Sequence, residues 1–325
     1  MKRILGYGTA SLALLACAVV VFFYAVKPSS AKPSTIKANT SPERVARGRY
    51  IYTLADCDGC HSERDFTRFA GPVVETGRGR GSVFPKELGM PGTIVAPNIT
   101  PDRETGIGAW TDGEKIRAIR DGIGRDGRPL FPMMAYEAFR SMSDEDVESL
   151  VAYLNTLAPV RHVVPRSVID FPVSMLARLA PKPAGSVPSP DRRDPVKYGE
   201  YLVTLAGCAG CHTSRDGGER FAGGERFAFP GATVVSANIT PDAATGIGSW
   251  TEEVFVNRFA RYRPYLEKGS PKTAPEAFTI MPWLALAQAT DSDLRAIYAY
   301  LRTQPAVSNQ VETHPGVLRA ATPDY

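Results

Sequence analysis

The stretch Cys57-Asp58-Gly59-Cys60-His61 has the pattern C-x-x-C-H, which returns at Cys208-Ala209-Gly210-Cys211-His212. This is the attachment pattern of a c-type haem, because two thiols one helical turn apart can add to the two vinyl groups on one porphyrin edge. The histidine that follows then lies under the iron and supplies its proximal nitrogen. We therefore expect two covalently attached haem c groups. The predicted residues are Cys57, Cys60 and His61 in the first motif and Cys208, Cys211 and His212 in the second.

Other chemistries of paired cysteines fit this pattern less well. A zinc site typically places its cysteine pairs within about 15–20 residues of each other, whereas these pairs lie in separate parts of the chain. A thioredoxin-like redox pair needs alternating strands and helices, and the sequence lacks that pattern. Two disulfides would leave the two trailing histidines without a role.

A longer internal repeat surrounds both motifs. The sequence N-I-T-P-D occurs at residues 98–102 and 238–242, and T-G-I-G-x-W-T occurs at 105–111 and 245–251. The landmarks keep their order while their separation varies, so the loops between them differ in length. Two long copies predict two similar domains, because a solenoid needs more and shorter units.

Each copy predicts a few helices and very little strand. A first helix is expected ahead of each motif, at about 41–54 and 195–205, and a middle helix after each tryptophan of the repeat. A last helix begins at Ser143 or Thr290, whose hydroxyl can cap it, and ends before Pro159 or Pro305. We expect a mainly α fold. The predicted divisions are a domain at 42–160, a Pro-rich extended connector at 161–195, a domain at 196–304 and a C-terminal tail at 305–325.

The second axial position of each iron needs a ligand from outside the motif, commonly methionine in cytochromes c. Met134 and Met281 each lie nine residues before the residue that caps the last helix, so the repeat pairs them. Met133 is the near rival, one step out of register. The histidines outside the motifs, His162 and His314, are expected at the surface and not at iron.

Trp110 and Trp250 occupy equivalent places in the two copies. Each indole either covers a haem edge or donates to a propionate, or it is a buried core residue whose N–H finds a carbonyl. Both interpretations stay open. Gly48 and Gly199, in the first helices, are expected to allow close packing against the last helices.

Residues 4–26 carry no charged side chain. As a helix they would extend about 35 Å, enough to cross a hydrocarbon core of about 30 Å. We expect residues 1–27 to form a membrane anchor, with a signal segment cut near residues 29–31 as the alternative. A flexible tether at 28–41 follows. Because haem c attachment needs an exported chain, the domains are expected in the periplasm, on the bacterial cytoplasmic membrane.

The composition is that of an ordinary globular protein. Of 325 residues, 43% are hydrophobic and 22% are charged, and the formal net charge is +4. So weak a positive bias gives no support to nucleic-acid binding, which usually needs a concentrated basic face.

Taken together, C-x-x-C-H, N-I-T-P-D, T-G-I-G-x-W-T and a Met ahead of the last helix resemble class I cytochrome c domains. The chain is most similar to the membrane-bound cytochrome c subunits of bacterial periplasmic dehydrogenases for alcohols, gluconate or aldehydes. The resemblance implies covalent haem with His61/Met134 and His212/Met281 as axial pairs. Two departures stand out: the alcohol and gluconate types carry three haems, and Ala135 follows the first ligand where Pro282 follows the second.

We therefore expect a membrane-tethered dihaem electron carrier and not an enzyme. Electrons would enter from a periplasmic dehydrogenase and leave to a terminal oxidase, a quinone site or a soluble cytochrome. Unequal insertions at residues 71–97 and 262–276 predict different docking faces. The alternatives are a peroxidase-like dihaem enzyme with one open iron, and a subunit that mainly anchors a dehydrogenase.

Overall fold

The computed structural model describes residues 28–229, 231–274 and 278–316, together with Leu14, Cys17, Ala18, Val21 and Phe22. Most of the expected membrane anchor, residues 4–26, lies outside the described residues. Within the part that is described, no helix combines the length and apolar character that crossing a membrane requires.

The first domain is built on helices whose starts follow from the sequence. Ser41 caps the first helix ahead of Pro42, Thr111 forms a capping box with Glu114, and the Ser143 hydroxyl accepts from the Asp146 amide. The helices are α2 (Pro42–Leu54), α3 (Cys57–His61), α4 (Asp112–Asp121), α5 (Tyr136–Phe139) and α6 (Asp144–Leu154).

The second domain repeats this plan with one additional helix. Asp194, Thr251 and Thr290 cap its first, middle and last helices. The helices are α8 (Pro195–Leu205), α9 (Cys208–His212), α10 (Glu252–Ala260), α11 (Arg263–Lys268), α12 (Trp283–Leu286) and α13 (Asp291–Arg302). The predicted first, middle and last helices of both copies are therefore confirmed.

In each domain the first and last helices pack directly on each other, α2 on α6 and α8 on α13. A Cβ atom on Gly48 would come within 1.8 Å of the Ser149 carbonyl oxygen, and one on Gly199 within 1.9 Å of that of Ala296. Only glycine permits so close an approach of the two backbones. The prediction that both glycines serve the helix contact is confirmed.

The strands among the described residues are short and lie on loops. One antiparallel sheet has the order β1-β2-β3, and a hairpin joins β4 to β5. The connector, which was expected to be extended, contains β3, because residues 168–169 pair with β2 of the first domain. It also contains α7 and a 3₁₀ turn. The remaining elements are η1 (Glu75–Gly77), β1 (Ser82–Phe84), η2 (Lys86–Leu88), β2 (Gly92–Ala96), β3 (Val168–Ile169), α7 (Val173–Leu176), η3 (Ala177–Leu179), β4 (Arg226–Phe229) and β5 (Ala232–Val235).

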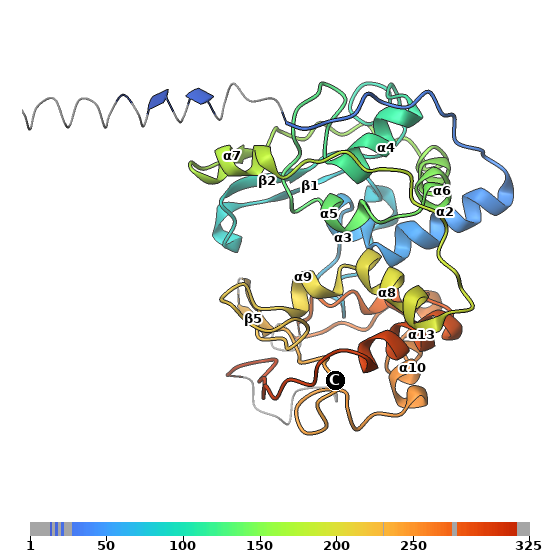
Figure 1. The fold of residues 1–325 in the computed structure, drawn as a ribbon, viewed down its shortest axis with the longest axis vertical. Helices are drawn as coiled ribbons and strands as arrows, with labels where there is room; N and C mark the ends of the chain where they lie inside the picture. The colour runs from blue at the N-terminus through green and yellow to red at the C-terminus, as the bar shows by residue number, and fades with distance from the viewer. Residues whose placement is uncertain are drawn as a thin grey trace, which may run out of the picture.

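The two domains share one buried apolar cluster, which runs from Ile51 and Val151 in the first to Leu202 and Ile297 in the second. Figure 1 shows the first domain above the second, with the motif helices α3 and α9 facing each other across the boundary. The two copies thus form one folded body with a continuous core.

The second insertion packs against the first domain. The Arg68 guanidinium donates to the Ser270 carbonyl oxygen at 2.7 Å, and the Phe69 ring stacks on Tyr262 with centroids 4.9 Å apart. Tyr262 is buried by this contact. The expectation that residues 262–276 form an outward docking face is wrong for this part of the loop, because its aromatic residues are used within the molecule.

Candidate functional site

Each C-x-x-C-H motif is a short helix that begins immediately after a backbone reversal. Asp56 has φ of +46° and Gly207 has φ of +65°, both in the left-handed region. The reversal separates α3 from α2 and α9 from α8, so each motif helix departs from the end of its domain's first helix. Glycine adopts this conformation freely, and aspartate is among the other residues that tolerate it.

The motif histidines are oriented alike in the two domains. His61 is 6% exposed and its Nδ1 lies 2.8 Å from the Pro97 carbonyl oxygen; His212 is 8% exposed and its Nδ1 lies 2.7 Å from that of Ala237. Burial lowers the pKa of both imidazoles, which favours the neutral ring. A neutral ring that donates from Nδ1 offers Nε2 as a metal ligand.

These two carbonyl groups are functional contributions that sequence reasoning missed. Pro97 and Ala237 directly precede the repeated N-I-T-P-D segments, which was the available signal. Within each segment the asparagine fixes the loop. The Asn98 amide donates to Val160 O at 2.7 Å and its Oδ1 accepts from the Thr100 amide at 2.9 Å, and Asn238 makes the equivalent bonds.

The motif cysteines are free thiols, as covalent attachment requires. None of Cys57, Cys60, Cys208 and Cys211 is in a disulfide. Before haem is attached, burial is the main cause that raises the pKa of Cys60 to about 11 and that of Cys208 to about 12, so both are thiols and not thiolates at neutral pH. The donor set of two free thiols and one neutral, oriented imidazole fits haem c in both domains. Within the described ranges, His, Cys, Asp and Glu side chains form no group of three or more that could hold a metal ion.

The two motifs are also close to each other. Burial, Asp56 and the neighbouring Cys211 thiol raise the pKa of Cys60, and Asp56 in turn contributes to raising that of Cys211. Each motif helix follows a first helix that contacts the other domain, α2 against α12 and α8 against α5. The attachment helices of the two domains therefore face each other, as Figure 1 shows for α3 and α9.

The predicted methionine ligands occupy equivalent places. Met134 lies two residues before α5 and Met281 two residues before α12, and both are half-buried against the shared core. Met133 is half-buried but is not among the residues packed on that core. This placement favours Met134 over Met133, and iron ligation by Met134 and Met281 remains a prediction.

The other candidate residues have mixed outcomes. Trp110 and Trp250 are half-buried against the core, which both interpretations allow, so haem contact stays a prediction. His162 is half-buried, with Nδ1 3.0 Å from the Arg80 carbonyl oxygen. The surface expectation for His314 is wrong: it is 7% exposed, and its Nε2 lies 3.1 Å from the Phe278 carbonyl oxygen.

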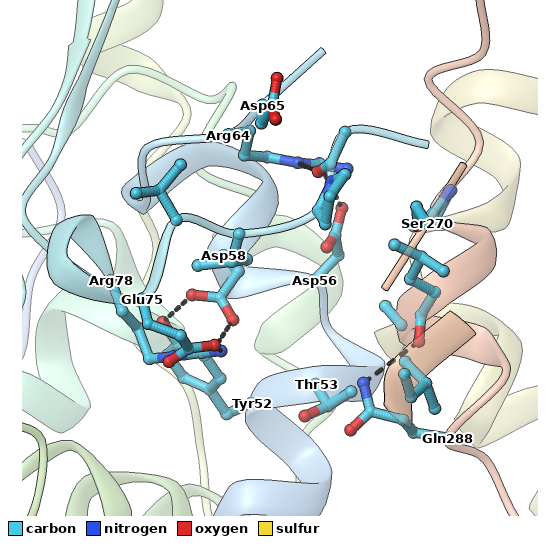
Figure 2. Close-up of a pocket in the computed structure, with 18 of the residues that line it drawn as sticks. Tyr52, Thr53, Asp56, Asp58, Arg64, Asp65, Glu75, Arg78, Ser270 and Gln288 are labelled. Atoms are coloured by element: carbon cyan, nitrogen blue, oxygen red, sulfur yellow. Dashed lines mark hydrogen bonds and ion pairs between the residues drawn. The ribbon is translucent and has the colours of Figure 1, made fainter. Parts of the chain in front are cut away.

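A cavity of about 1030 Å³ lies between the domains, away from the predicted ligands. Its wall combines charged residues beside the first motif with residues of α11 and α12 (Figure 2). Asp56 and Asp58 line it, but none of the motif cysteines, motif histidines or predicted methionines does. The cavity is therefore a feature of the domain interface and of the surroundings of the first motif.

Comparison with known proteins identifies the family. The cytochrome c family model matches residues 45–158 and 196–305. The alcohol dehydrogenase (quinone) cytochrome c subunit of Gluconacetobacter polyoxogenes is 31% identical over 284 residues, covering 81% of this chain and 56% of that subunit. The fructose dehydrogenase cytochrome subunit of Gluconobacter japonicus is 32% identical over 296 residues, covering 86% and 56%.

A third relative has nearly the same length as this chain. The diheme cytochrome c-type protein of Cereibacter sphaeroides is 28% identical over 312 residues, which cover 92% of this chain and 98% of that protein. By contrast, the chain spans only about half the length of the two dehydrogenase subunits. Two matched domains, each with an intact motif and an oriented histidine, lead to one conclusion: the chain belongs to the cytochrome c family and carries two covalently bound haem c groups.

Proposed function

We propose that this protein relays single electrons in the periplasm, from a dehydrogenase to a downstream acceptor of the respiratory chain. The observation that carries the proposal is the equivalent setting of His61 and His212, each buried and oriented by a backbone carbonyl, in motifs that face each other. The named dehydrogenase subunits among its relatives support a dehydrogenase as donor. The acceptor would be a terminal oxidase, a quinone site or a soluble cytochrome.

The haem supplies a reversible one-electron change at iron, and the chain supplies its attachment, ligation and surroundings. Cys57, Cys60, Cys208 and Cys211 would hold the two groups covalently. His61 and His212 would bind iron through Nε2, because Nδ1 faces a backbone carbonyl. Met134 and Met281 would close the opposite positions and exclude small ligands, as an electron carrier requires.

The membrane tether is part of the proposal. The uncharged stretch at residues 4–26 supports an anchor in the cytoplasmic membrane, with residues 28–41 as a tether to the periplasmic domains. This tether contacts α4, where the Ala38 amide donates to Asp112 Oδ2 at 3.0 Å. The tether would therefore hold the first domain at a short distance from the membrane.

The test is a visible spectrum of the reduced holoprotein with and without carbon monoxide. We expect two c-type haems per chain and no change on adding the gas. Met134→Ala and Met281→Ala should each open one iron, so that about half of the haem binds carbon monoxide. Met133→Leu is the matched control and should stay closed. Carbon monoxide binding by the native protein would instead favour the dihaem enzyme with one open iron.

A further inference from the structure

The two motifs share their cysteines and histidine but differ in the residues between and around them. Asp58 stands between the cysteines of the first motif, where Ala209 stands in the second. Asp56 precedes the first motif, where Gly207 precedes the second. If both irons have the same His/Met pair, as the proposed function holds, the ligands cannot separate their potentials. Any difference must then come from the surroundings.

Asp58 is held in a network of three donors, of which Figure 2 labels Tyr52 and Arg78. The Tyr52 hydroxyl donates to Asp58 Oδ1 at 2.7 Å, the Ser62 hydroxyl donates to the same oxygen, and the Arg78 guanidinium donates to Oδ2. Its side chain is only 16% exposed. Three donors hold this carboxylate in place beside the motif.

Arg78 is shared with a second carboxylate, Glu75, whose Oε1 lies 2.6 Å from Arg78 Nη2. The hydrogen bond from Arg78 and the charge of Arg49 both lower the pKa of Glu75, so the charge of Glu75 is offset. Asp58, between the two cysteines, is the carboxylate that distinguishes the first motif. Its field reaches the attachment site, because burial and then the Asp58 carboxylate raise the pKa of Cys57.

The second motif lacks a carboxylate at the place of Asp58. Its counterpart of Arg78 is Arg220, because each precedes the residue whose carbonyl accepts from Ile99 or Ile239. Arg220 is exposed, with its guanidinium 4.7 Å from the Phe221 ring centroid, and Ala209 offers it no carboxylate. The arginine that both domains have at this place is thus paired with a carboxylate of the motif only in the first domain.

The other charged neighbours of the motifs offset each other. Asp56 faces Arg64 at 4.0 Å in the first domain. In the second domain the Arg215 amide donates to buried Glu225 at 2.8 Å, and the two side chains form an ion pair. Each motif therefore has an arginine–carboxylate pair of this kind, and Asp58 in place of Ala209 remains as the difference between the motifs.

We propose that the Asp58 network holds the first haem at a lower reduction potential than the second. Oxidised haem carries one more positive charge than reduced haem, so a nearby negative charge stabilises the oxidised form. The reduced first iron would then give one electron to the oxidised second iron across the facing motifs. The first iron is oxidised in this step and the second is reduced. The first domain would be the entry site for electrons from the dehydrogenase, and the second the exit.

The test is a potentiometric titration of the holoprotein, followed by haem absorbance, in three variants. Asp58→Asn keeps the shape of the side chain and removes its charge. It should raise the lower of the two potentials, by roughly the 59 mV that corresponds to a tenfold change for one electron. Arg78→Gln removes the positive partner and should lower that same potential. A general loosening of the site would not give shifts of opposite sign.

Ala209→Asp is the matched variant in the second motif and should lower the higher potential only. A shift of the higher potential by Asp58→Asn, or no shift at all, would overturn the proposed order. Haem content and the carbon monoxide test are measured on the same samples. Native protein that lacks a haem or binds the gas counts against the relay itself. If both haems stay closed to the gas but Asp58→Asn shifts the higher potential, the result counts only against the role of Asp58.

Discussion

At the scale of single residues, the two asparagines of the N-I-T-P-D segments hold the loops that orient the haem histidines. Asn98 is 1% exposed, and its side chain bonds to Thr100, Thr105 and Val160 at once. Asn238 does the same in the second domain. Since Pro97 directly precedes Asn98, a loose asparagine loop would also displace the carbonyl that fixes His61.

We expect Asn98→Ala to lower the free energy of unfolding by about 3 kcal/mol, because it leaves several buried polar groups without partners. Asn39→Ala, at an exposed position, is the control and should change stability by less than about 0.5 kcal/mol. Urea unfolding followed by haem absorbance measures both. Equal stability of the two variants would show that the loop does not depend on the asparagine.

At the scale of elements, the crossing of α2 on α6 depends on the absence of a side chain at Gly48. The backbone of α2 at Gly48 lies against the Ser149 carbonyl of α6, and the same contact recurs between Gly199 and Ala296. Because these helices position the start of each motif, a shift at the crossing would be transmitted to the haem attachment site.

Gly48→Ala should therefore destabilise the protein by about 1–3 kcal/mol or more, since the added Cβ meets backbone that cannot move aside cheaply. Gly185→Ala is the matched control, because nothing lies within 4 Å of the Cβ it would add. Thermal unfolding of the two variants tests the contrast. An unchanged melting temperature for Gly48→Ala would contradict this account of the crossing.

The elements differ in how far the sequence could predict them. Caps and motifs are local patterns, so the main helices, the free thiols and the paired places of Met134 and Met281 could be anticipated. The carbonyls of Pro97 and Ala237 could not, because a backbone acceptor has no residue type of its own. The His314 imidazole meets the carbonyl oxygen of Phe278, which is distant in the chain, and local sequence does not encode such a contact.

At the scale of the whole molecule, the repeat is reflected in a reciprocal contact between the domains. The Tyr50 hydroxyl of α2 donates to Asp293 Oδ2 of α13, and the Tyr201 hydroxyl of α8 donates to Asp146 Oδ2 of α6 at 2.5 Å. The tyrosines occupy equivalent places in the two copies, as do the aspartates. Each domain therefore gives its partner the same hydrogen bond that it receives, which suits two domains with facing haem motifs.

We expect Tyr50→Phe and Tyr201→Phe each to lower the free energy of unfolding at pH 7 by about 1–2 kcal/mol, because each removes a hydrogen bond to a charged group. Each carboxylate keeps another donor, Tyr198 for Asp293 and Arg47 for Asp146. Burial and the partner carboxylate raise the pKa of both tyrosines. A pKa raised in the folded state gives stability that is complete below the unfolded value of about 10 and is lost above it. Urea unfolding at pH 7 and pH 11 should therefore show a smaller alkaline loss in the double variant than in the native protein. The same alkaline loss in both would mean that these two hydroxyls do not hold the domains together.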